Sequence, residues 1–152
     1  AMTGASRAHG LIALNLGAFL RPLLRGGDCQ AFVSDMKVRL QIAGDDVFYY
    51  PDLVMTCDPD DRASDYCQAP CLVVEILSPK TRRIDRREKF LAYTSIPSLR
   101  GYLLVAQDRR QVELFRREHG WNPEVFHDGA VPLACLESML PLEAIYEGVD
   151  LG

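Results

Sequence analysis

The spacing of apolar residues divides the chain into a leading helix, a series of short strands and a central helix. In residues 6–25 the apolar side chains recur at helical spacing, and Gly26-Gly27 ends the pattern. Pro22 lies near the end of this segment, where it would kink the last turn because it has no backbone N–H to donate. The pattern therefore predicts an amphipathic helix that packs on a core.

Short runs rich in β-forming residues follow the leading helix. Residues 29–33 and 36–40 form two such pieces around Ser34-Asp35, and the alternation of apolar and polar residues up to Ile42 indicates a half-exposed strand. The turn signal Gly44-Asp45-Asp46 predicts that this strand pairs as a hairpin with the apolar run 49–55. Further strands are predicted at residues 71–77, 101–106, 111–116, 121–126 and 130–133, with a polar, solvated loop at 57–70 and a short closing helix at 142–146.

The segment 51–93 combines two carboxylates, a buried strand and a basic helix. Glu75 interrupts the apolar run 71–77, and a carboxylate there is costly to desolvate unless a divalent cation, a lysine or an arginine meets it. A helix is predicted over 82–93, ending before Ile96-Pro97 because the residue before a proline avoids the helical region. Asp85, Lys89 and Tyr93 recur at every fourth residue of this helix, so they share one face.

Length and composition indicate a folded protein of ordinary globular type. The 152 residues are expected to form one domain, spanning 1–152, with 48% hydrophobic and 25% charged residues. The net charge of −4 argues against a protein that coats nucleic acid non-specifically, although a local basic patch can still bind phosphates. Whole-chain charge therefore does not decide the function.

The cysteines and the leading apolar segment bear on the compartment. The five cysteines include no CxxC pair and are accompanied by only three histidines, which argues against a zinc knuckle. The apolar stretch 11–24 is broken by Asn15, Arg21 and Pro22 and is too short to span a bilayer, so neither a secretory segment nor membrane attachment is predicted. Free thiols in a reducing cytoplasm are therefore expected.

Asp52 and Glu75 are the candidate metal ligands. Magnesium takes oxygen ligands, usually one or two carboxylates with water and substrate phosphate oxygens, and two carboxylates on adjacent strands would supply that set. Such a site suits phosphodiester hydrolysis, in which Lys89 would orient the attacking water or neutralise charge on the phosphorus. His9, before the apolar stripe of the leading helix, is predicted to be a surface or packing residue.

The basic residues of the central segment are candidates for binding a nucleic-acid backbone. Basic residues interleaved with Asp85 and Glu88 on an exposed helix more often form surface ion pairs, so for the helix charges alone that alternative is favoured. The candidates are Lys80, Arg82, Arg83, Arg86 and Arg87.

Three motifs together resemble the Uma-type family of restriction-endonuclease-like proteins, which belongs to the PD-(D/E)XK nuclease superfamily. They are Pro51-Asp52, Glu75 within residues 73–79, and Asp85-x-x-x-Lys89-x-x-x-Tyr93. The resemblance covers nearly the whole chain. It implies an α+β or α/β fold, with a mixed β-sheet flanked by α-helices.

The resemblance also implies a site and a substrate. Asp52 and Glu75 would bind Mg²⁺ or Mn²⁺, Asp35 would be an additional acidic site residue, and the substrate would be DNA. The superfamily pattern places a lysine two residues after the glutamate, where this chain has Leu77, so the resemblance suggests that Lys89 takes over that role. A homodimer is expected, because two sites related by two-fold symmetry can cut both strands of a duplex.

Two other interpretations remain open. The chain could be a catalytically inactive module of the same fold that binds nucleic acid or another protein, as Leu77 at the lysine position would favour. Alternatively, Glu75 could pair with Lys89 or an arginine only to orient the strand and the helix. Metal-dependent cleavage of DNA separates the nuclease from both.

Overall fold

The computed structural model describes residues 5–78 and 83–151, with the side chains of residues 84 and 85 excepted. The helices are α1 (Arg7–Leu24), α2 (Arg83–Thr94) and α3 (Leu142–Ile145), with a short 3-10 turn at Arg117–His119. The strands are β1 (Gln30–Val33), β2 (Lys37–Ile42), β3 (Asp45–Tyr49), β4 (Leu53–Thr56), β5 (Tyr66–Cys67), β6 (Pro70–Leu77), β7 (Gly101–Ala106), β8 (Val112–Arg116), β9 (Pro123–Phe126), β10 (Ala130–Leu133) and β11 (Ser138–Pro141).

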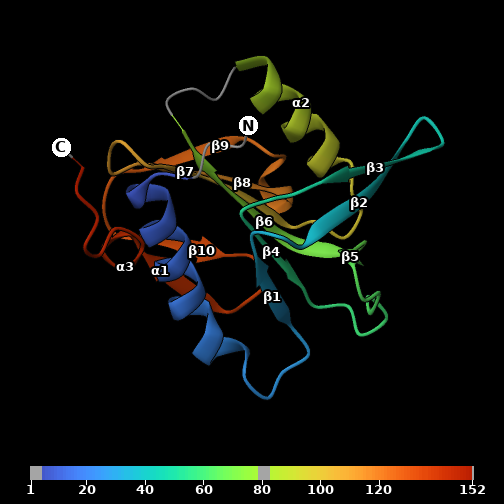
Figure 1. Ribbon diagram of the computed structural model, residues 1–152, viewed down its shortest axis with the longest axis horizontal. Coiled ribbons are helices and arrows are strands. Elements are labelled where there is room, and N and C mark those ends of the chain that lie inside the picture. Colours follow the sequence, from blue (N-terminus) through green and yellow to red (C-terminus); the bar gives the residue numbers. More distant parts are fainter. Residues whose placement is uncertain (1–4, 79–82, 152) are drawn as a thin grey trace.

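A six-stranded mixed sheet forms the centre of the fold, in the order β1-β4-β6-β7-β8-β9. Neighbouring strands in it are antiparallel except β6 and β7, which run parallel and are joined through α2. The strands β3-β2-β5 form a second sheet and β10-β11 a third. Figure 1 shows these sheets with the helices around them, so the predicted mixed sheet flanked by helices is confirmed.

The two faces of the central sheet carry separate hydrophobic clusters, because side chains alternate along each strand. On one face Leu72, Val74 and Ile76 of β6 pack in the cluster that includes the buried stripe of α1. On the other face Val73 packs with Tyr93 of α2 and with β2. Val73 and Leu77 both lie in the cluster on the α2 side, so Glu75, midway between them, points to the same side.

Helix α1 agrees with the apolar pattern that predicts it. The residues Ile12, Leu16, Leu20 and Leu24 recur every fourth position and are all buried. The N-cap is Ser6, whose hydroxyl oxygen accepts a hydrogen bond from the backbone N–H of His9 at 3.0 Å. Pro22 lies inside the last turn, as the sequence predicts.

The predicted hairpin is only partly correct. Strand β2 does form a hairpin, but with β3, and the turn is at Ala43-Gly44, where φ is 51° and 85°. Positive φ at both central residues gives the tight turn whose twist matches paired strands. The run 49–55 is not one strand: it changes sheet at Pro51, and β4 pairs with β1 and β6 instead.

Two further elements escaped the sequence patterns. The segment 57–70, predicted as a solvated polar loop, contains β5, which pairs parallel to β2, and it buries the carboxylate of Asp61. Strand β11 pairs with β10 in the third sheet. Both missing strands are short, with two residues in β5 and four in β11, so neither shows a clear alternation of its own.

The prediction of free thiols is wrong for four of the five cysteines. Cys29 is disulfide-bonded to Cys57, and Cys71 to Cys135, whereas Cys67 is free and buried. The antiparallel register pairs Gln30 with Thr56, so the flanking Cys29 and Cys57 lie opposite each other. Spacing along the chain cannot reveal such a cross-strand pair. Among the described residues, no helix combines the length and apolar character needed to cross a membrane.

Candidate functional site

Asp52 and Glu75 meet because two central strands are paired in a fixed register. Leu53 of β4 is paired with Val74 of β6, which brings Asp52, the residue before β4, beside Glu75. The backbone N–H of Ile76 donates a 2.7 Å hydrogen bond to Oδ2 of Asp52. The two carboxylates predicted as metal ligands therefore lie together at one end of these strands.

Glu75 is a buried carboxylate whose partners are distant. Its side chain is on the α2 face, where the hydroxyl of Tyr93 donates to Oε1 at 3.5 Å and Nζ of Lys89 lies 3.9 Å from Oε2. Burial raises the pKa of Glu75 to about 7, the charge of Lys89 lowers it, and the charge of Asp52 raises it further. Contacts at these distances are too long to compensate fully for desolvation of the charged form.

Tyr93 stays neutral and serves as a donor to Glu75. Its side chain is fully buried, and burial is the main cause that raises its pKa far above the ordinary value. Its ring packs against the rings of Tyr49 and Tyr102, with centroids 5.6 Å and 5.5 Å away. Lys89 and Tyr93 thus both face Glu75, as their spacing on the helix predicts.

His9 is the site residue to which the sequence patterns gave too little weight. Its Nε2 lies 2.9 Å from Oδ1 of Asp52, and this hydrogen bond is the main cause that raises the pKa of His9. The start of α1 is also held by the hydroxyl of Ser6, which donates to the side chain of the buried Gln107 after β7. A contact across 43 positions leaves no local signal, so only the packing of α1 reveals it.

Asp35 and Asp85 are the two secondary acidic candidates. Asp35 is exposed in the turn after β1, where the neighbouring Ser34 N–H donates to the backbone oxygen of Asp52 at 3.0 Å. Within the described chain, no contact links the Asp35 carboxylate to Asp52 or Glu75. The side chain of Asp85 lies outside the described residues.

The basic candidates differ in their surroundings. Arg86 forms an ion pair with Glu113 of β8, with 3.3 Å between nitrogen and oxygen, which agrees with the alternative of a surface ion pair. Arg83 and Arg87 are exposed on α2. Lys80 and Arg82 lie outside the described residues.

Leu77 occupies the position where the superfamily pattern has its lysine. Its half-buried side chain packs against the hydrophobic cluster on the α2 face, on the same side of β6 as Glu75. The cation near Glu75 comes instead from Lys89. In the part of the chain that the structure describes, no group of three or more histidine, cysteine, aspartate and glutamate side chains is arranged to hold a metal ion.

This chain is similar to proteins of cyanobacteria. It is 41% identical over 118 residues to "Uncharacterized protein slr1290" of Synechocystis sp. strain PCC 6803, covering 77% of this chain and 61% of that protein. It is 34% identical over 120 residues to "Uncharacterized protein sll1609" of the same organism, covering 76% of this chain and 66% of that protein. The match therefore spans less than two thirds of the length of either relative.

A solved structure shares the fold. The crystal structure of a putative nuclease belonging to DUF820 from Anabaena variabilis has a TM-score of 0.75 to this chain and 18% sequence identity. The match covers 95% of this chain and 83% of that one. At this level of identity the likeness shows a common fold. The model of the Uma2 family, described as putative restriction endonuclease, matches residues 1–143, and the chain belongs to this family.

Proposed function

We propose that this chain is a magnesium-dependent endonuclease that hydrolyses phosphodiester bonds in DNA. The observation that carries the proposal is the meeting of Asp52, Glu75 and Lys89 at one end of the central strands, with Glu75 buried and only loosely paired. Membership of the Uma2 family supports the same reaction class.

The donor set suits Mg²⁺ or Mn²⁺. These ions use one or two protein carboxylates and take their other ligands from water and substrate phosphates, so Asp52 and Glu75 would be sufficient. The raised pKa of Glu75 supports this fit, because a nearby cation would stabilise the charge that burial disfavours. When bound, the ion supplies positive charge next to the phosphorus and acidifies a water molecule.

The other side chains of the site hold the carboxylates and meet the substrate. His9 fixes the orientation of Asp52 through Oδ1, while the Ile76 N–H holds Oδ2. Tyr93 donates to Glu75 from the buried side of the site. Lys89 is about two-fifths exposed, so its ammonium can leave Glu75 and contact a phosphate oxygen or orient the attacking water.

Nicking of supercoiled plasmid DNA tests the proposal, measured with Mg²⁺, with Mn²⁺ and with a chelator. We expect metal-dependent nicking by the wild type and its loss in Lys89→Ala, because the ammonium near the scissile phosphate is removed. Arg109→Ala, at an exposed position in the turn after β7, is the matched control and should nick like the wild type. Full activity of Lys89→Ala would exclude the proposed role of this lysine.

The inactive module is the second candidate function, and Leu77 is the observation that favours it. An apolar side chain occupies the superfamily's lysine position, and Lys89 could serve only to neutralise Glu75. In that case the protein would bind DNA or a protein partner but would not nick plasmid DNA with either metal.

A further inference from the structure

The outer face of the small sheet β3-β2-β5 carries aromatic rings and basic side chains in contact with one another. Nζ of Lys37 lies 5.5 Å from the centre of the Phe48 ring. The guanidinium carbon of Arg39 lies 5.7 Å from the centre of the Tyr66 ring. The Phe48 and Tyr66 rings meet edge to face, with centroids 6.4 Å apart. We refer to Lys37, Arg39, Phe48 and Tyr66 as the aromatic-basic face.

These rings are not part of the hydrophobic core. On the opposite side of the same strands Val38, Leu40 and Cys67 are buried against α2 and the central sheet. Phe48 is 42% exposed, and Tyr50, just after β3, is 60% exposed. In Figure 1 the β2-β3 hairpin projects beyond the rest of the fold. The aromatic-basic face is therefore accessible to a ligand.

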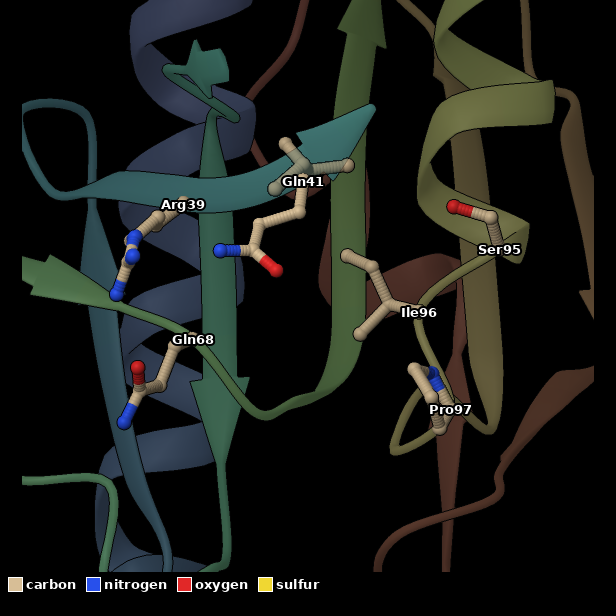
Figure 2. Close-up of a pocket in the computed structure, with 7 residues that line it drawn as sticks. Arg39, Gln41, Gln68, Ser95, Ile96 and Pro97 are labelled. Atoms are coloured by element: carbon tan, nitrogen blue, oxygen red, sulfur yellow. The ribbon is translucent and has the colours of Figure 1, made fainter. Parts of the chain in front are cut away.

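A polar cavity of about 330 Å³ adjoins this face. Figure 2 shows Arg39 and Gln41 of β2 and Gln68, which follows β5, at one side of it, with Ile96 and Pro97 after α2 across the gap. Arg39 and Gln41 each donate one hydrogen bond to Asp46, which leaves other guanidinium and amide groups available. The backbone N–H of Gln68 donates to Asp61. Among the described residues, the side-chain amide of Gln68 makes no hydrogen bond.

The small sheet is attached to the candidate site. Tyr49 of β3 packs its ring on Tyr93, whose hydroxyl donates to Glu75. Tyr50 is the next residue, and Asp52 lies two positions after it. A strand of nucleic acid whose phosphate lies at Asp52 and Glu75 can therefore continue over Tyr50 and onto the aromatic-basic face.

We propose that the aromatic-basic face and the adjoining cavity bind single-stranded DNA. The rings of Phe48 and Tyr66 would stack on bases, and Lys37 would meet a phosphate, which is the chemistry of single-strand binding. In the cavity, arginine and glutamine side chains offer the paired donors and acceptors that read a base edge. In a duplex the flat faces of the bases are covered by their neighbours, so this surface selects a substrate with an unpaired segment.

This inference rests on the proposed function, because the bound strand is taken to be the substrate of the Asp52-Glu75 site. The two proposals depend on different side chains. Nuclease activity needs the two carboxylates, whereas the affinity for unpaired DNA needs the rings of the small sheet. The two can be separated by measuring binding without metal and nicking with metal.

Fluorescence anisotropy of a labelled oligothymidine of 20 nucleotides, and of a 20-base-pair duplex, tests the inference in the presence of a chelator. We expect Phe48→Ala to weaken binding of the single strand about tenfold, because the variant loses the stacking of one base on the Phe48 ring. Duplex binding should change less than twofold. Met139→Ala, at a similarly exposed apolar position on β11, is the matched control and should bind like the wild type.

Lys37→Gln provides a second variant in case Phe48→Ala does not fold, because the half-buried Lys37 is not part of the hydrophobic core. It should weaken single-strand binding about threefold and reduce its salt dependence, as expected when one phosphate contact is lost. Wild-type affinity for the single strand in both variants would overturn the inference, as would a wild type that nicks duplex DNA but does not bind the single strand. Both of those results leave the nuclease proposal intact, whereas a wild type that neither binds nor nicks DNA contradicts both.

Discussion

Two buried carboxylates of this protein, Asp61 and Glu75, have opposite surroundings. Asp61 is 5% exposed and accepts three short hydrogen bonds, from the Thr56 hydroxyl at 2.8 Å and from the backbone N–H groups of Gln68 and Ala69 at 3.1 Å and 3.0 Å. Glu75 is 8% exposed, and its described contacts are 3.5 Å and 3.9 Å long. The first carboxylate is saturated by the protein, and the second is left able to take a ligand.

Burial alone does not tell whether a carboxylate has a structural role or is available to a ligand. A fully bonded carboxylate stabilises the segment that surrounds it, here the loop between β4 and β6. A loosely bonded one costs stability unless a cation arrives, and such groups are typical of functional sites. Substitutions at Glu75, Asp61 and His9 separate these two roles.

Glu75→Gln should lower the rate of metal-dependent plasmid nicking by at least about a hundredfold, because it removes a proposed ligand of the ion that stabilises the transition state. The rate of nicking at saturating Mg²⁺ is the measurement. Glu137→Gln, at an exposed position next to β11, should retain wild-type activity. Equal activity of the two variants would show that Glu75 is not a ligand.

Asp61→Ala should lower the free energy of unfolding by about 3 kcal/mol, because two backbone N–H groups and a hydroxyl lose their shared acceptor inside the protein. Urea denaturation followed by circular dichroism measures this. The variant should still gain stability from Mg²⁺. A loss of metal response without a loss of stability would reverse the roles that we assign to the two carboxylates.

Glu75→Gln should raise the free energy of unfolding at pH 8, by roughly 3 kcal/mol. The folded-state pKa of about 7 lies above the ordinary value of 4.5, so folding favours the protonated acid. The wild type therefore has this contribution in full below pH 4.5 and loses it as the pH rises through 7. The gain from the amide should vanish at pH 4, and the same gain at both pH values would contradict the argument.

His9→Ala should weaken Mg²⁺ binding about tenfold, because the residue that orients a ligand carboxylate tunes the affinity of the site. His127→Ala, a change at an exposed histidine in the turn after β9, controls for the loss of an imidazole. Calorimetric titration of both variants gives the comparison. Unchanged affinity in His9→Ala would reduce its contact with Asp52 to a packing role.

The amino-acid sequence predicts the frame of the fold well, because the frame follows from local patterns. The stripe of α1, the buried run of β6 and the spacing of Lys89 and Tyr93 on α2 all agree with the structure. The parallel pairing of β5 with β2 and the two disulfides depend on long-range pairing, which leaves no periodic signal. The predicted cytoplasmic location, homodimer and single domain stay predictions.

The candidate site could be anticipated only in part. An isolated glutamate in an apolar strand and the departure at Leu77 both point to Glu75 and Lys89, and the structure brings these two together. His9 reaches Asp52 only because α1 packs across the ends of the strands, and Asp61 is buried although its neighbours in sequence are polar. Contacts made by the packing of distant elements are what local patterns omit.

Calorimetric titration with Mg²⁺ and Mn²⁺ at pH 8 is the decisive test of whether Glu75 is held ready for a divalent cation. The wild type and Glu75→Gln are titrated side by side, and urea denaturation confirms that both are folded. We predict that the wild type binds metal and that Glu75→Gln does not. When the titration is repeated near pH 7, metal binding to the wild type should release protons from Glu75. Equal binding by both proteins, or binding by neither in the presence of a short DNA duplex, would contradict the claim.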